Sequence, residues 1–96
     1  HEKTLQLLLA DPRVDVNHSD KFGYTALIYA AIKGHEKSVQ LLLEDSRVDV
    51  NSISVYGLGA LYAAVIEDHV GVVGKLLDHP DINLDVLDES LEGLAR

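Results

Sequence analysis

Hydrophobic residues recur along the chain with the spacing of short amphipathic helices. The Ala-rich run 25–32 predicts one such helix, because Thr25 suits the N-cap position and Gly34 suits the left-handed position that follows a helix end. A second helix is predicted over roughly 36–44. Its apolar residues follow i, i+3, i+4 spacing and share one face: Val39, Leu42 and Leu43. The pattern therefore indicates a helix–turn–helix unit.

A stretch of different character follows the helix pair. Residues 47–51 alternate apolar and polar side chains, which predicts an extended conformation, and a glycine-containing turn follows at 54–57. A unit of this size cannot bury its apolar face alone. It must stack on further copies of itself to form a continuous core.

The same unit recurs at an offset of 34 residues. Segment 14–17, for example, returns as 48–51. Laid over each other, residues 1–34 and 35–68 are identical at 18 of 34 positions. A third, weaker copy keeps the same phase through His69, Leu76, Leu77, Ile82, Leu84 and Asp88. Three copies in one phase predict a stack of repeats.

These residues resemble the repeat of the ankyrin family, whose usual pattern runs Asp-x-x-Gly-x-Thr-Pro-Leu-His-x-Ala-Ala, then Gly-His, Leu-Leu-Leu and Ala-Asp-Val-Asn. The matching positions are Asp20, Gly23, Thr25, Leu27, Ala30, Ala31, Gly34, His35, Leu42, Leu43, Asp49, Val50 and Asn51. The resemblance covers residues 1–85. It implies an all-α fold, an ankyrin-type α-solenoid of stacked helix–turn–helix repeats with short β-hairpin or loop fingers.

The repeat phase divides the chain, residues 1–96, into units of a single domain. Residues 1–17 are predicted to be the second half of a repeat whose first helix is missing, 18–51 and 52–85 to be full repeats, and 86–96 to be a partial repeat or a cap. We interpret the chain as a segment of a longer protein.

The chain departs from the family pattern in its first helices and in its second copy. Ala26 and Ile28 occupy the positions of the usual Pro and His, so we expect weaker polar ties between repeats. In the second copy the usual Asp, Thr and Gly are replaced by Ser54, Gly59 and Asp68. We expect that copy to be locally looser.

Charge and composition narrow the classes of partner. The 96 residues carry a net charge of −8 with only 8 Lys and Arg, whereas nucleic-acid binding needs clustered basic residues. The same charge disfavours an anionic membrane surface. The chain has no cysteine, and no apolar run approaches the ~20 residues of a membrane span. We expect an intracellular, cytoplasmic protein that binds neither nucleic acid nor membrane.

No group of residues has the spacing of a catalytic, cofactor or metal site. His1, His35 and His69 recur once per repeat, so they lie too far apart to share a metal ion. Segment 57–59 lacks the third glycine of a phosphate-binding loop, and no Ser/His/Asp set shares a predicted face. We predict no enzyme activity, no metal, no cofactor and no small-molecule substrate.

The family resemblance also implies where a protein partner binds: hairpin fingers and first helices line a concave face. The residues that this places on the face are Ser19, Lys21, Phe22, Tyr24, Ile32, Lys33, Ile53, Val55, Tyr56, Leu58, Ile66 and Glu67. Residues 1–17 match 35–51 at 13 of 17 positions, whereas the first finger (18–24) and the second finger (52–58) share only one glycine. Residues that pack one repeat on the next must be similar in every copy, whereas residues of a binding face can differ between copies.

We therefore predict a non-catalytic protein–protein interaction scaffold. The second finger is unusually apolar, and exposed apolar surface with aromatic anchors is typical of a binding site. The alternative is that Ile53, Val55 and Leu58 pack against an adjacent repeat or a covering domain. The alternative function is a regulatory or targeting segment of a larger multidomain protein (an enzyme, channel, immune receptor or effector) whose activity lies outside this chain.

Overall fold

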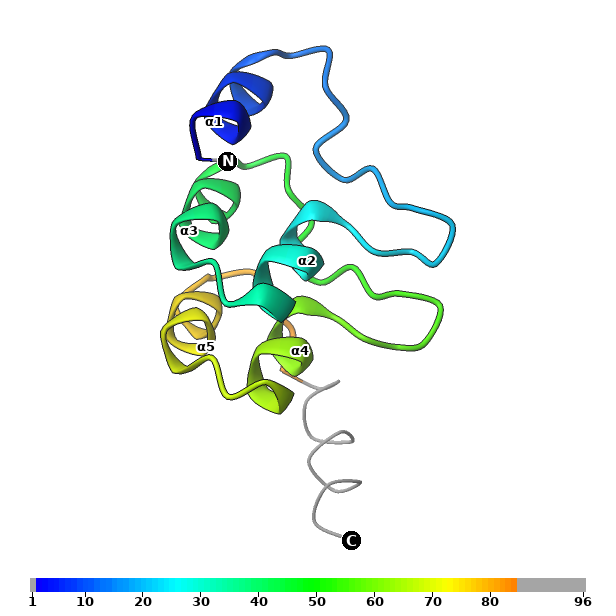
Figure 1. Cartoon of the computed structure of the whole chain (residues 1–96), viewed down its shortest axis with the longest axis vertical. Helices are drawn as coiled ribbons and strands as arrows, with labels where there is room; N and C mark the ends of the chain where they lie inside the picture. The colour runs from blue at the N-terminus through cyan, green and yellow to red at the C-terminus, as the bar shows by residue number, and fades with distance from the viewer. Residues whose placement is uncertain (1, 85–96) are drawn as a thin grey trace, which may run out of the picture.

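The computed structural model describes residues 2–84, and the chain forms five helices in that range (Figure 1). They are α1 (Glu2–Ala10), α2 (Ala26–Lys33), α3 (Glu36–Glu44), α4 (Ala60–Ile66) and α5 (Val70–Leu77). Within residues 2–84 there is no strand, and one isolated antiparallel bridge joins Ile53 to Gly59. The predicted all-α fold is confirmed. The predicted unit 86–96, with Asp88, lies outside the described residues.

The five described helices form two layers. Helices α1, α3 and α5 stack along one side, α2 and α4 stack beside them, and the two fingers project beyond α2 and α4 (Figure 1). Packing joins α1 to α3, α3 to α5 and α2 to α4 across copies, and it joins α2 to α3 and α4 to α5 within a copy. Each copy thus lies on the next, as the sequence repeat predicts. None of the five is long and apolar enough to cross a bilayer.

Helix α2 begins and ends where the sequence predicts. Thr25 is its N-cap, and the Thr25 hydroxyl accepts a hydrogen bond from the backbone N–H of Ile28 at 3.3 Å. Gly34 follows its end with a φ of 71°, a left-handed conformation that glycine adopts without Cβ strain. The Gly34 N–H donates to the carbonyl of Ala31 at 3.3 Å. The chain then reverses, so that α3 starts at Glu36 and packs against α2.

The core lies between the two layers and is aliphatic. The residues that are at most 2 % exposed are Leu27, Ile28, Ala31, Val39, Leu42, Ala60, Ala63, Ala64, Val72 and Leu76. Ile28 stands where the family pattern has histidine, and its side chain is fully buried. This position therefore contributes hydrophobic packing in place of a polar contact.

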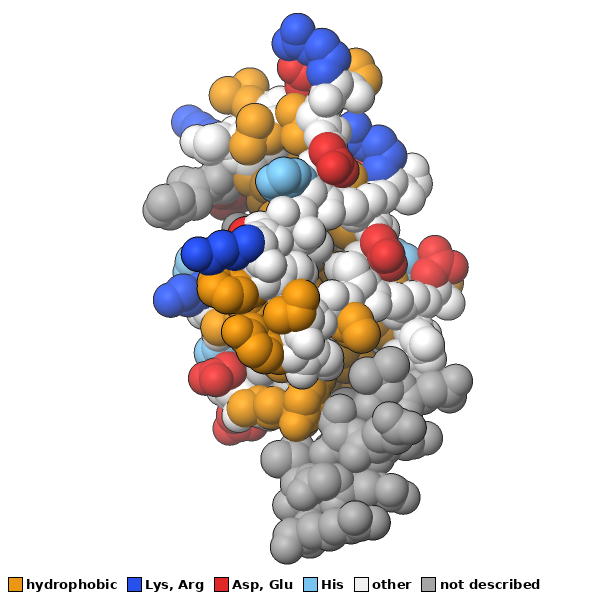
Figure 2. Space-filling model, turned by 90° about the vertical axis from the view of Figure 1, so that its right-hand side faces the viewer, with side chains coloured by type: hydrophobic (Ala, Val, Ile, Leu, Met, Phe, Trp, Pro, Cys, Tyr) orange, Lys and Arg blue, Asp and Glu red, His pale blue; other side chains and the backbone are white. Residues whose placement is uncertain are grey.

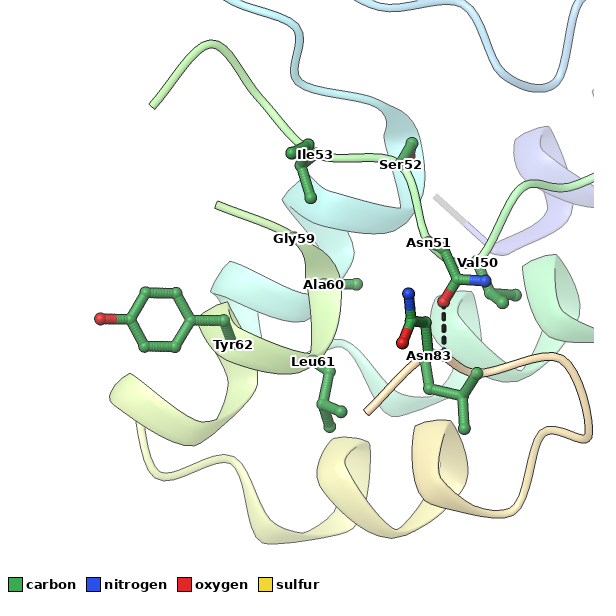
Figure 3. A pocket seen from close by; sticks show the side chains of 10 residues that line it. Val50, Asn51, Ser52, Ile53, Gly59, Ala60, Leu61, Tyr62 and Asn83 are labelled. Carbon is green, nitrogen blue, oxygen red and sulfur yellow. Dashed lines mark hydrogen bonds between the residues drawn. The ribbon is translucent and has the colours of Figure 1, made fainter. Parts of the chain in front are cut away.

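Polar contacts still tie the repeats together, through two asparagines, Asn17 and Asn51, whose hydrogen bonds the sequence pattern does not predict. The Asn17 side chain donates to the carbonyl of Arg47 and accepts from the N–H of Asp49, both at 2.7 Å. Asn51 makes the equivalent two bonds one copy later, at 2.8 and 2.7 Å, and the bond from the N–H of Asn83 is drawn in Figure 3. Asn17 therefore joins the connection after α1 to the connection after α3, and Asn51 joins the connection after α3 to the segment after α5.

The second finger keeps the side-chain hydrogen bonds of the first, although a serine replaces the aspartate. In the first finger, Asp20 Oδ1 accepts from the N–H groups of Phe22 at 2.9 Å and Tyr24 at 3.0 Å. The buried Ser54 Oγ accepts from the two equivalent N–H groups, each at 3.2 Å. The replacement of aspartate by Ser54 therefore leaves this turn closed.

Both ends of α4 do lose a feature that α2 has. Gly59 is the N-cap of α4 and has no side chain to accept the hydrogen bond that Thr25 accepts in the first copy. Asp68 adopts a φ of 57° where the first copy has Gly34. This left-handed conformation costs a residue with a Cβ about 1 kcal/mol or more. The second copy is thus the less well capped of the two.

The connection after α3 contains two turns, at 46–47 and 50–51, where the alternating pattern predicts an extended segment. Asp45 Oδ1 accepts from the N–H of Arg47 at 2.9 Å, which closes a turn directly after the helix. The alternation does report burial correctly, because Val50 is buried and Val48 is half-buried. Local side-chain bonding therefore determines the backbone here, while the pattern determines which residues face the core.

Candidate protein-binding site

The two fingers lie side by side and share a backbone hydrogen bond. The N–H of Val55 in the second finger donates to the carbonyl of Phe22 in the first at 2.9 Å. Gly23, with a φ of +81°, lies so close to the second finger that a Cβ on it would be 3.0 Å from the Cα of Ser54. Glycine at this position therefore permits both the tight turn and the contact between fingers.

Four aromatic side chains, which we call the aromatic cluster, gather at the fingers and α2: Phe22, Tyr24, Tyr29 and Tyr56. The rings of Phe22 and Tyr56 stack with their centroids 6.2 Å apart. The centroid of the Tyr24 ring lies 6.4 Å from that of Tyr56 and 5.4 Å from that of Tyr29. Tyr56 is 69 % exposed and Phe22 40 % exposed. Rings that hold each other in place while they remain accessible have the character of binding hot spots.

Tyr29 is the member of the cluster that the sequence analysis missed. Its hydroxyl donates a hydrogen bond to Asp20 Oδ2, which ties α2 to the first finger. This bond holds the pKa of the Asp20 carboxyl below its usual 3.8, against a smaller opposing effect of burial. The same bond raises the pKa of the Tyr29 hydroxyl above 10.0. The sequence does contain one signal for this contact. Tyr29 lies one helical turn after Thr25, in the part of α2 that is next to the first finger.

We expect Tyr29→Phe to raise the pKa of Asp20 toward 3.8, because the ring stays while the main stabilising contact of the carboxylate is removed. The folded-state pKa is the depressed one. The ionised carboxylate therefore stabilises the fold above its unfolded pKa, and this contribution is lost as pH falls through the folded pKa. NMR titration of the Asp20 carboxyl in both proteins measures the difference. Equal midpoints would show that the Tyr29 bond does not hold the carboxylate.

The two copies also border a small, partly open space, which we call the apolar hollow. Its walls are Ile32 of α2, Leu58 of the second finger, and Ala63 and Ile66 of α4, and Glu67 lies at its edge where α4 ends. Its volume is about 140 Å³. Within residues 2–84 the Glu67 carboxylate has no hydrogen-bond or ion-pair partner. The hollow is thus apolar inside and negative at its rim.

The structure groups the predicted residues into the aromatic cluster and the apolar hollow. Phe22, Tyr24 and Tyr56 belong to the cluster, with the Lys21 ammonium 5.1 Å from the centre of the Phe22 ring. The hollow takes in Ile32, Leu58, Ile66 and Glu67. The remaining predicted residues are not part of either group.

Those remaining residues are Ser19, Lys33, Ile53 and Val55. Lys33 lines a separate space of about 420 Å³ between α1, α2 and α3. Val55 is 69 % exposed and Ile53 51 % exposed, so no residue between 2 and 84 covers either side chain fully. Leu58, in contrast, is half-buried against the core. Leu58 thus both packs against the core and lines the apolar hollow.

The finger side of the molecule carries a patch of hydrophobic side chains with Lys and Arg beside it (Figure 2). Charge differs between the two copies on this side. Lys33 at the end of α2 corresponds to Glu67 at the end of α4, and Asp68 follows it. The end of the first helix is therefore positive in the first copy and negative in the second copy.

A third space, shown in Figure 3, lies at the edge of the second copy near Asn51 and Asn83. Its volume is about 30 Å³, which is far below the ~300–1,000 Å³ of typical ligand pockets. The Tyr62 ring points away from it (Figure 3). Three or more His, Cys, Asp or Glu side chains converge nowhere within residues 2–84.

Comparison with known proteins identifies the repeat. A family model described as ankyrin repeats, in three copies, matches residues 1–88. No curated protein matches the chain.

Solved structures give a further likeness, with 36 matching chains. One of them comes from the complex of a predatory endopeptidase from Bdellovibrio bacteriovorus with an immunity protein. It is 30 % identical to this chain, with a TM-score of 0.74, and the match covers 83 % of this chain. The match covers 40 % of that chain, so this chain spans less than half of its length.

Proposed function

Because the chain belongs to the ankyrin repeat family, we propose that it is a non-catalytic scaffold that binds a protein partner. Stacked helical repeats present extended concave surfaces that such proteins use for binding. The surface that we propose comprises Ser19, Lys21, Phe22, Tyr24, Tyr29, Ile32, Lys33, Ile53, Val55, Tyr56, Leu58, Ile66 and Glu67. The repeat units 18–51 and 52–85 are the scaffold that carries it.

The observation that carries this proposal is the exposed aromatic cluster. Phe22 and Tyr56 come from different repeats, and their exposed faces add up to one apolar surface. Aromatic side chains dominate the energetics of protein interfaces because they bury a large area with little loss of side-chain entropy. The rings contact each other across the two fingers, yet a large part of Phe22 and Tyr56 stays exposed, and exposed apolar patches of this kind mark interaction sites.

The solved complex supports a protein as the partner. It joins an endopeptidase to an immunity protein, and one of its chains shares the fold of this chain at 30 % identity. An endopeptidase is therefore one class of partner to include in a search. The second candidate is that the surface acts as a regulatory or targeting segment of a larger protein whose activity lies elsewhere.

Affinity purification with the chain as bait tests the proposal. We expect wild type and Val70→Ala to retain the same protein, and the double variant Phe22→Ala/Tyr56→Ala to lose it. Val70 is the matched control, because it is 73 % exposed but lies on α5 in the other layer. Equal retention by all three proteins would place the binding site elsewhere.

A further inference from the structure

We infer that the apolar hollow and Glu67 together recognise one feature of the partner: a large apolar side chain with a Lys or Arg within two residues of it. This inference rests on the proposed function and adds the chemistry of the segment that the surface accepts. The partner residue that enters the hollow is aliphatic or aromatic, and the basic residue pairs with the carboxylate at the rim.

The size and lining of the hollow select the apolar side chain. Its volume of about 140 Å³ is close to that of the ~150 Å³ apolar protein cavity that binds benzene. It therefore has room for one ring or one branched aliphatic side chain. Its walls, among them Ile32 and Ile66, offer no side-chain hydrogen bond, so a polar side chain would lose its water contacts without replacement.

The charge at the rim selects the basic neighbour. The Glu67 carboxylate has no partner within residues 2–84, and the side chain of Asp68 beside it likewise makes no hydrogen bond or ion pair there. A Lys or Arg of the partner can form a charge-assisted hydrogen bond with either carboxylate. The net charge of −8 also favours the approach of a basic segment.

The first finger sets the direction of that segment. The Lys21 ammonium already lies over the Phe22 ring, so a second cation gains nothing there and is repelled. Lys33 adds positive charge on the same copy. The Asp20 carboxylate of the first finger already accepts hydrogen bonds from Tyr29 and from two backbone N–H groups. The Glu67 carboxylate has no such partner within residues 2–84, so a basic residue of the partner is favoured beside α4, which gives the segment one orientation.

Selection of phage-displayed random peptides on the whole chain tests this inference without knowledge of the natural partner. We expect recovered peptides to be enriched in a large apolar residue within two positions of Lys or Arg. Replacing that apolar residue by Ala in a synthetic peptide should weaken binding about tenfold.

A charge reversal in the protein tests the second half of the motif. Glu67→Lys introduces the residue that the first copy already has at the equivalent position, Lys33, so the helix end accommodates it. We expect it to weaken the selected peptides about two- to fivefold and to improve binding of the same peptides with Lys or Arg changed to Glu. Glu44→Lys is the control, because it makes the same charge change at the end of α3 in the other layer.

The outcomes separate this inference from the proposed function. Peptides that need Phe22 and Tyr56 but lack the motif, or are affected equally by Glu67→Lys and Glu44→Lys, would overturn the inference and leave the proposed function standing. A selection that recovers no peptide, or recovers only peptides indifferent to Phe22, Tyr56 and Glu67, would overturn both.

Discussion

Leu42→Ala is expected to lower the free energy of unfolding by about 2–5 kcal/mol, whereas Leu8→Ala should lower it by about 1 kcal/mol or less. Leu42 is 1 % exposed on α3, and Leu8, at the equivalent position of α1, is 47 % exposed. Removal of the Leu42 side chain loses the free energy gained by burying it away from water, and it leaves a cavity among α1, α2 and α3. The Leu8 side chain is half in water already, and solvent fills the space that it leaves.

This pair of variants isolates the contribution of stacking. The same residue is removed from the same kind of helix, 34 positions apart in the sequence. What differs is that α3 packs against α2, α1 and α5, whereas the main packing partner of α1 is α3 alone. Urea unfolding followed by circular dichroism gives both values. Equal losses of stability would mean that packing by neighbouring helices does not make Leu42 more important than Leu8. The assignment of Leu42 to the buried core would then be wrong.

Gly23→Ala is expected to lower the free energy of unfolding by about 2–4 kcal/mol, through backbone strain and through displacement of the second finger. The φ of +81° is unfavourable for Ala, and its Cβ would be 3.0 Å from the Cα of Ser54 and 3.2 Å from the N of Val55. Both of these atoms belong to backbone, so the finger must shift. The shift breaks the hydrogen bond from Val55 to Phe22 and separates the rings of the aromatic cluster.

Gly57→Ala is the matched control for Gly23→Ala. Its φ of +75° imposes a similar strain, but apart from its neighbours in the sequence no residue has an atom within 4 Å of the position that a Cβ would occupy. We expect it to cost about 1–2 kcal/mol, the strain alone. Unfolding measurements compare the two variants, and NMR contacts between the rings of Phe22 and Tyr56 report on finger separation. If both variants cost the same and both keep the ring contacts, Gly23 does not mediate contact between the fingers.

The fold could be predicted from sequence because its signals are local or periodic. The capping threonine at 25 and the glycine at 34 act within a few residues of themselves, so their neighbours suffice to identify them. The offset of 34 then predicts that like helices lie on like helices, and the packing of α2 on α4 follows. The connection 47–51 was misjudged because an Asx bond at Asp45 overrides the alternating pattern.

The candidate site was predicted less completely, because its parts come from distant segments. The two fingers meet through the hydrogen bond from the Val55 N–H to the Phe22 carbonyl, and no local pattern in either finger indicates that contact. Tyr29 was assigned to the helix alone, although its hydroxyl reaches Asp20. The hollow is assembled from α2, α4 and the second finger, so its volume depends on the distance between repeats. Periodicity predicts that these residues lie on the same side of the stack, but it does not predict that a hollow forms between them.

The most direct test of the central claim, that the finger side binds a protein, is calorimetric titration of the purified partner. The titration compares wild type, Phe22→Ala/Tyr56→Ala and Val70→Ala, with circular dichroism to establish that each variant is folded. We predict that the double variant binds about tenfold more weakly or worse, and that Val70→Ala binds like wild type. A folded double variant with wild-type affinity would contradict the claim.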